Sequence, residues 1–75
     1  MINIEFAEQQ IYFIFDVNGK YYRVSFEYKK NDSNWAVRLI DVKRNETVYS
    51  QTLNVVVTPD IELAQNIVKT YISRG

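Results

Sequence analysis

Two alternating runs of apolar and polar residues meet at Asn18-Gly19, which is the clearest structural signal in the chain. A two-residue hairpin turn of type I′ needs positive φ at both central positions, and Asn-Gly adopts that conformation at low cost. The sequence therefore predicts a hairpin of strands over residues 10–17 and 20–29. The turn also fixes the pairing, which is Phe15–Tyr22, Phe13–Val24 and Ile11–Phe26 on an apolar side, and Asp16–Tyr21, Ile14–Arg23, Tyr12–Ser25 and Gln10–Glu27 on a mixed side.

Three further segments show the period of strands. Ile2, Ile4 and Phe6 alternate with polar residues and predict a strand over 2–7, which would extend the apolar side of the hairpin. A polar loop follows the hairpin, and alternation resumes over 35–42. After the charged loop at 43–46, β-branched and aromatic residues predict a long last strand over 47–57.

The register of the last strand is open at this stage. The simplest pairing sets Leu39 opposite Ser50, which leaves Tyr49 and Leu53 on the outer side of the sheet. A β-bulge near residues 50–52 would bring the apolar residues back to the core side.

The C-terminal segment has the pattern of a helix over 59–72. Thr58 is expected to be the N-cap and Pro59 the first helical residue, with Asp60 and Glu62 near the positive end of the helix dipole. The apolar residues recur at helical spacing and are expected to pack on the sheet. They are Ile61, Ala64, Ile67, Val68, Tyr71 and Ile72.

Together these elements predict an α+β protein of two layers, in which a helix packs on one face of an antiparallel meander of four to five strands. Seventy-five residues provide apolar side chains for only one core, so residues 1–75 are expected to form a single domain.

The composition argues against catalysis. Histidine and cysteine are both absent, which removes the side chains most easily tuned to acid-base and nucleophilic work near neutral pH. No sequence motif of a metal or phosphate site is present. We therefore expect a non-enzymatic protein with no cofactor and no metal.

The charge balance restricts the partners. Nine Lys and Arg offset nine Asp and Glu, so no strong field draws the chain to duplex DNA or to anionic lipid. The longest aliphatic run, over 55–57, is far too short to span a bilayer. These features and the lack of a secretory signal predict a cytoplasmic protein that has no membrane contact.

The mixed side of the sheet is the candidate contact surface. Its aromatic, aliphatic and Arg side chains have the composition of protein-binding surfaces. The predicted partner-binding residues are Tyr12, Ile14, Tyr21, Arg23, Arg38, Ile40 and Tyr49.

Several functions remain open. The first hypothesis is a protein-binding module that acts through this aromatic face or through the last strand, which lacks the Lys, Pro or Gly that would block an exposed edge. Its size and its richness in Asn, Ile, Tyr and Val suggest a phage or mobile-element accessory or inhibitor protein. The second is single-stranded nucleic-acid binding on the same face. The third is a structural homodimer or assembly subunit. The nucleic-acid contacts would be Tyr12, Tyr21 and Tyr49 for stacking, and Arg23, Arg38 and Lys20 for phosphates.

Overall fold

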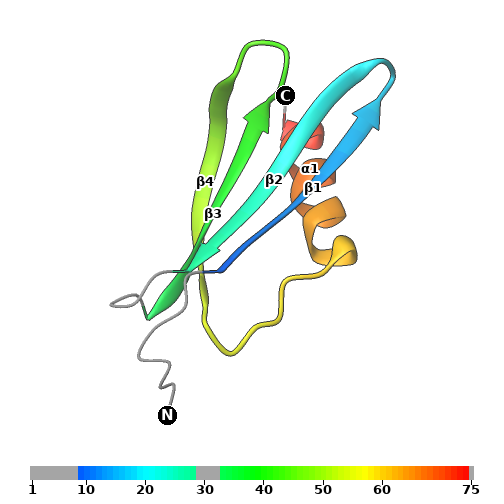
Figure 1. Ribbon diagram of the computed structural model, residues 1–75. Coiled ribbons are helices and arrows are strands. Elements are labelled where there is room, and N and C mark those ends of the chain that lie inside the picture. Colours follow the sequence, from blue (N-terminus) through cyan, green and yellow to red (C-terminus); the bar gives the residue numbers. More distant parts are fainter. Residues whose placement is uncertain (1–8, 29–32, 75) are drawn as a thin grey trace.

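The computed structural model describes residues 9–28 and 33–74, and these fold into one sheet and one helix (Figure 1). The strands pair in chain order as an antiparallel meander, β1-β2-β3-β4, which confirms the predicted α+β class. The predicted strand over 2–7 lies outside the described residues. The elements are β1 (Gln9–Val17), β2 (Lys20–Tyr28), β3 (Asn34–Asp41), β4 (Glu46–Asn54) and α1 (Ile61–Arg74).

The first hairpin has the predicted turn and the predicted register. Asn18 and Gly19 have φ values of 53° and 86°, as a type I′ turn requires. The Gly19 N–H donates to Asp16 Oδ1 at 2.8 Å, which holds the turn closed. Every cross-strand pair expected from the turn is observed, from Asp16–Tyr21 to Gln10–Glu27.

The register of β4 differs from the simplest expectation. Leu39 pairs with Tyr49 and Ile40 pairs with Thr47, so β4 carries one extra residue, Val48, between them. The predicted pairing of Leu39 with Ser50 is therefore wrong. A bulge does correct the register as anticipated, but it lies at Val48 and not at 50–52, and it places Tyr49 and Leu53 on the same side as the core.

Strand β4 ends earlier than predicted. The Asn54 side chain accepts the Val56 N–H through Oδ1 at 3.0 Å, and the Asn54 carbonyl accepts the Val57 N–H at the same distance. These bonds turn the chain, so residues 55–57 form a connection and not the end of a strand. Trp35 Nε1–H donates to the Val57 carbonyl at 3.0 Å and ties this connection to β3.

The helix starts two residues later than predicted, because Asp60 and not Thr58 is its N-cap. Asp60 Oδ1 accepts the Leu63 N–H at 2.8 Å, and the Asp60 carbonyl accepts the Ala64 N–H at 3.1 Å. Pro59 consequently precedes the helix, and its side chain is buried. The predicted start with Pro59 as the first helical residue is wrong.

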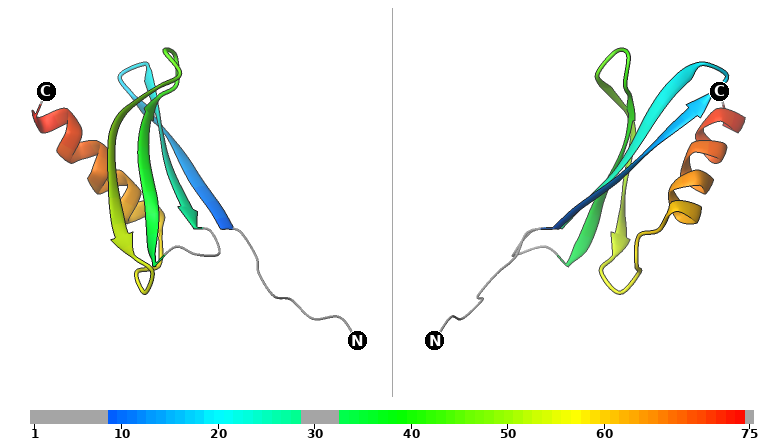
Figure 2. Two further views of the ribbon diagram at one scale, coloured as in Figure 1. Left: turned by 90° about the vertical axis from the view of Figure 1, so that its left-hand side faces the viewer. Right: turned by 45° about the vertical axis from the view of Figure 1, so that its right-hand side comes forward.

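Helix α1 forms a second layer on one face of the sheet (Figure 2). The buried core comprises alternate residues of β2 and β3 and the middle of α1. Its members are Tyr22, Val24, Phe26, Trp35, Val37, Leu39, Ala64, Ile67 and Val68. Two residues expected to pack on the sheet do not, since Ile61 is 60% exposed and Ile72 is 41% exposed. Only the central part of the predicted apolar stripe is fully covered.

Candidate functional site

The face of the sheet opposite α1, called the outer face below, carries six of the seven predicted contact residues. Tyr12, Ile14 and Tyr21 are about half exposed and form an apolar group on β1 and β2. Ile40 also lies on this face but is only 5% exposed, so the expectation that it is available for contact is wrong. Its cross-strand neighbours Arg23 and Thr47 flank it on β2 and β4.

The two arginines of the outer face already have partners within the chain. Arg38 forms an ion pair and hydrogen bond with Glu27 on the adjacent strand. The Arg23 guanidinium lies over the ring of Tyr12, 5.9 Å from its centroid, in cation–π geometry. A ligand would have to displace these contacts to use either charge.

Tyr49, the seventh residue, lies on the opposite face. The bulge at Val48 turns Tyr49 toward α1, where it is half-buried and packs against the core. Lys20 also points to this side, because it shares the face of Tyr22, and its ammonium lies 5.4 Å from the centroid of that ring. The outer face therefore lacks two of the six residues proposed for nucleic-acid contact.

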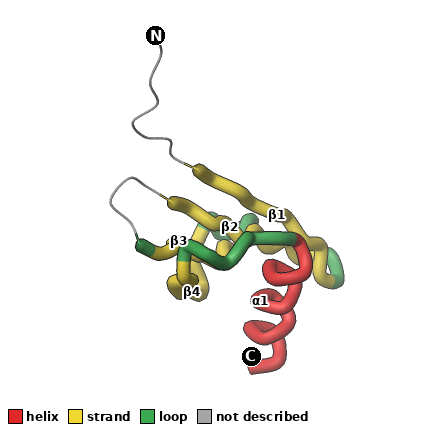
Figure 3. Tube along the Cα trace, turned by 90° about the horizontal axis from the view of Figure 1, so that it is seen from below, coloured by secondary structure: helices red, strands yellow, loops and turns green. Residues whose placement is uncertain are grey.

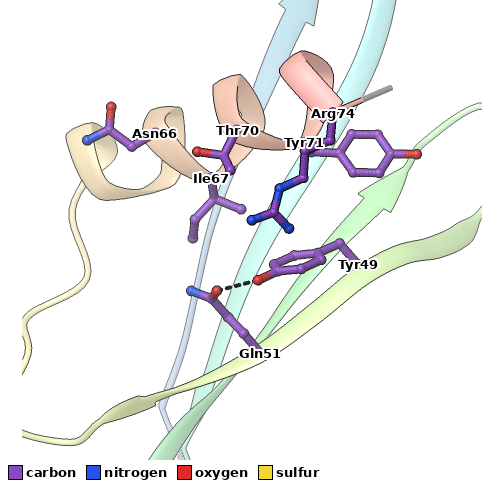
Figure 4. Close-up of a pocket in the computed structure, with 7 residues that line it drawn as sticks. All are labelled: Tyr49, Gln51, Asn66, Ile67, Thr70, Tyr71 and Arg74. Carbon is purple, nitrogen blue, oxygen red and sulfur yellow. Dashed lines mark hydrogen bonds between the residues drawn. The ribbon is translucent and has the colours of Figure 1, made fainter.

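Tyr49 is part of a groove between β4 and α1 (Figure 4). We call this the β4–α1 groove. Its cavity has a volume of about 160 Å³ and opens into a wider hollow next to Tyr22 and Ile72. Its lining residues are Tyr49, Gln51, Asn66, Ile67, Thr70, Tyr71 and Arg74.

The groove exists because α1 is displaced toward one side of the sheet. The helix makes its main contacts with β1 and β2, and in the view from below it lies beside that half of the sheet (Figure 3). The inner surface of β4 is left partly uncovered, and Leu53 on this surface is only partly buried. In Figure 4, Tyr49 and Gln51 rise from β4 toward α1, and Arg74 extends from the last turn of α1 toward β4.

The polar side chains of the groove include several hydrogen-bond donors. The Tyr49 hydroxyl donates to Gln51 Oε1 at 2.7 Å, and the Gln51 amide nitrogen has no acceptor among the residues that the structure describes, so it can donate to a ligand. The Asn66 amide, the Thr70 hydroxyl and the Arg74 guanidinium add further N–H and O–H groups. Arg74 is the one charged side chain among the lining residues.

The charge of Lys20 is balanced by an ion pair with Asp41. The Lys20 ammonium lies 3.3 Å from Asp41 Oδ2, and the Asp41 side chain is almost completely buried. Burial acts to raise the pKa of Asp41, but the N–H of Arg44 and the Lys20 ammonium outweigh it and hold that pKa below its usual value. The pKa of Lys20 is raised, most by interaction with the Tyr22 side chain and then by Asp41.

Strand β4 is also the last strand of the sheet formed by the described residues. Within β4 the residues from Thr47 to Asn54 carry no charge, and none is Lys, Pro or Gly. An edge of this composition leaves backbone N–H and C=O groups able to pair with another strand. The edge and the β4–α1 groove are adjacent, because Tyr49 and Gln51 belong to both.

The sequence did not identify this site. Tyr71 belongs to the predicted packing stripe of α1 and is partly buried against the core, and Asn66 lies outside that stripe and is exposed. An amphipathic Tyr at the C-terminal end of the stripe, followed by Arg74, was the available signal, but the displacement of α1 over the sheet cannot be deduced from helical periodicity.

Two chemical features are absent from the part of the chain that the structure describes. Among residues 9–28 and 33–74, no three acidic side chains gather where they could hold a metal ion. The same residues include no helix with the length and apolar character needed to cross a membrane.

Comparison with protein-family models, with curated proteins and with solved structures finds no match to this chain.

Proposed function

We propose that this protein is a small non-enzymatic binding module that takes up an extended segment of another protein as an additional strand beside β4. The observation that carries the proposal is that β4 ends the described sheet and borders an open groove against α1. In this mode of recognition, main-chain hydrogen bonds supply affinity, and pockets for alternate side chains supply specificity. The β4 edge provides the main-chain hydrogen-bonding groups, and the groove provides the pocket for a side chain.

Side-chain chemistry supports this choice over the outer face. The groove is lined by large aromatic side chains, Tyr49 and Tyr71, whose rings offer apolar contact area at low entropic cost. On the outer face, Ile40 is buried and the charges of Arg23 and Arg38 are already engaged. From its size and residue usage alone, we propose that the chain is an accessory or inhibitor protein of a phage or mobile element.

The other two hypotheses have less support. Single-stranded nucleic acid would have only Tyr12 and Tyr21 for stacking on the outer face, and the chain has no net positive charge. A homodimer would use the same β4 edge, with a second copy in place of the foreign segment. The oligomeric state of the protein therefore has to be measured alongside peptide binding.

The test uses a displayed library of random nine-residue peptides, the length of β4, selected on the immobilised protein. Selected peptides are then titrated in solution by fluorescence anisotropy. Binding should slow amide hydrogen exchange in β4, because its outward N–H groups acquire acceptors. Exchange that stays unchanged in β4 while peptide binds elsewhere would contradict the proposal.

A pair of charge substitutions locates the contact. Lysine on an edge strand opposes strand addition, so Ser50→Lys with Thr52→Lys should weaken peptide binding by about tenfold or more. Ala36→Lys is the control, because Ala36 is exposed on the same face and pairs with Thr52, but it lies on the inner strand β3. Equal losses in the β4 variant and the control would show that the β4 edge is not used.

A further inference from the structure

The charge within the β4–α1 groove indicates what kind of segment it takes. Arg74 is the one charged residue in the lining, and no acidic side chain of the described residues lies within salt-bridge distance of it. Arg38 and Arg44, by contrast, pair with Glu27 and Glu46. We propose that the segment bound at β4 carries a carboxylate side chain that enters the groove and pairs with Arg74.

Strand geometry brings such a side chain to the groove. Alternate side chains of a strand point to the same face of a sheet. A strand added beside β4 would therefore place every second side chain next to Tyr49, Gln51 and Leu53, on the side that faces α1. One of these side chains would lie at the mouth of the groove, where Arg74 extends toward β4 (Figure 4).

The other polar groups can all donate to a carboxylate, and the positive charge of Arg74 disfavours an amine. The Gln51 amide nitrogen, the Thr70 hydroxyl and the Arg74 guanidinium can all donate hydrogen bonds into the groove. An ionised carboxylate accepts on both oxygens, and its pairing with a guanidinium is stronger and more directional than a neutral hydrogen bond. Arg74 is exposed, so a carboxylate can reach it, and the rings of Tyr49 and Tyr71 would lie beside the pair.

A second copy of this chain would not supply the same complement. The residues of β4 that point toward α1 beyond the bulge are Tyr49, Gln51 and Leu53, and none is acidic. Glu46 is the one acidic residue of β4, and its carboxylate already pairs with the Arg44 guanidinium at 3.1 Å. Charge complementarity therefore favours a foreign acidic segment.

This inference rests on the proposed strand addition. The peptide library tests strand addition at β4 and the pairing with Arg74 separately. Sequences selected on the protein should be enriched in Asp or Glu at one position of the strand. Replacing that acid by Gln in a selected peptide should weaken binding by about tenfold, which is typical for loss of a close charge pair. The same replacement in the peptide should have little effect on its binding to the Arg74→Gln variant, because the peptide change and the protein change remove the same interaction.

Lys69→Gln is the matched control. Lys69 is exposed on the same helix and does not line the groove, so its loss changes the net charge equally without touching the site. Thermal unfolding of Arg74→Gln and Lys69→Gln should match that of the parent chain, which separates a binding effect from a folding effect. Binding of the acidic peptide should survive in Lys69→Gln and fall in Arg74→Gln.

The outcomes are distinct. Peptides that depend on the β4 edge but show no acidic preference would overturn the Arg74 pairing and leave the proposed function intact. A library that yields no binder dependent on the β4 edge would overturn both. Light scattering that shows a dimer, dissociated by the paired Lys substitutions in β4, would identify a second copy as the occupant and also overturn the acidic-segment proposal.

Discussion

Replacement of Ser25 by alanine should stabilise this protein. Ser25 lies on the outer face in the middle of β2, is 1% exposed, and its hydroxyl has no hydrogen-bond partner among residues 9–28 and 33–74. Its cross-strand neighbours Tyr12 and Arg38 carry long side chains that flank this small residue. A buried hydroxyl without a partner costs about 1–3 kcal/mol, and alanine removes that cost while losing only one atom of packing.

The expected net gain is about 1 kcal/mol in the free energy of unfolding. In a domain of this size, 1 kcal/mol corresponds to a rise of about 4–8 °C in the melting temperature. Urea unfolding followed by tryptophan fluorescence measures the change, since the chain has a single Trp and it is buried. The midpoint should rise with no change in the m-value.

Ser50→Ala is the matched control. Ser50 lies on the same outer face and also pairs with Arg38, but it is exposed on β4. Its hydroxyl is hydrated, so the substitution should change stability by less than about 0.5 kcal/mol. A loss of more than that in Ser25→Ala would mean that the hydroxyl is bonded in solution, and the reasoning would be wrong.

Two further predictions concern the helix start and the buried carboxylate. Asp60→Ala should cost about 1 kcal/mol in urea unfolding because it removes the N-cap, whereas Thr58→Ala should be nearly neutral; the reverse order would restore Thr58 as the cap. The lowered pKa of Asp41 means that its contribution to stability is complete above its ordinary value of 3.8 and is lost as the pH falls through the lower folded-state value. Asp41→Asn should therefore flatten the fall in urea midpoint on acidification below about pH 5, and parallel curves for the variant and the parent chain would contradict the assignment.

The sequence by itself determined the first hairpin completely. A two-residue turn at Asn18-Gly19 admits one register, and the alternation around it assigns each side chain to a face without reference to the rest of the molecule. The class of fold and the presence of a C-terminal helix followed from periodicity in the same way.

Local pattern was less informative at the helix start. Thr58 and Asp60 are both favourable N-cap residues, and Pro59 is favourable at the first helical position, so the local sequence supports two starts that lie two residues apart. Burial of Pro59 ahead of the helix, which depends on the tertiary fold, accompanies the choice of Asp60.

Only the tertiary structure decided which face of the sheet Tyr49 occupies and where α1 lies. The loop between β3 and β4 is longer than a two-residue turn, and the β4 sequence has apolar or β-branched residues on both faces, so its register is weakly specified locally. The packing of Tyr49 and Leu53 against the core favours the register with the bulge at Val48. The groove beside β4 depends in turn on the displacement of α1 toward β1 and β2, because helical periodicity defines which side of a helix is buried but not which strands it covers.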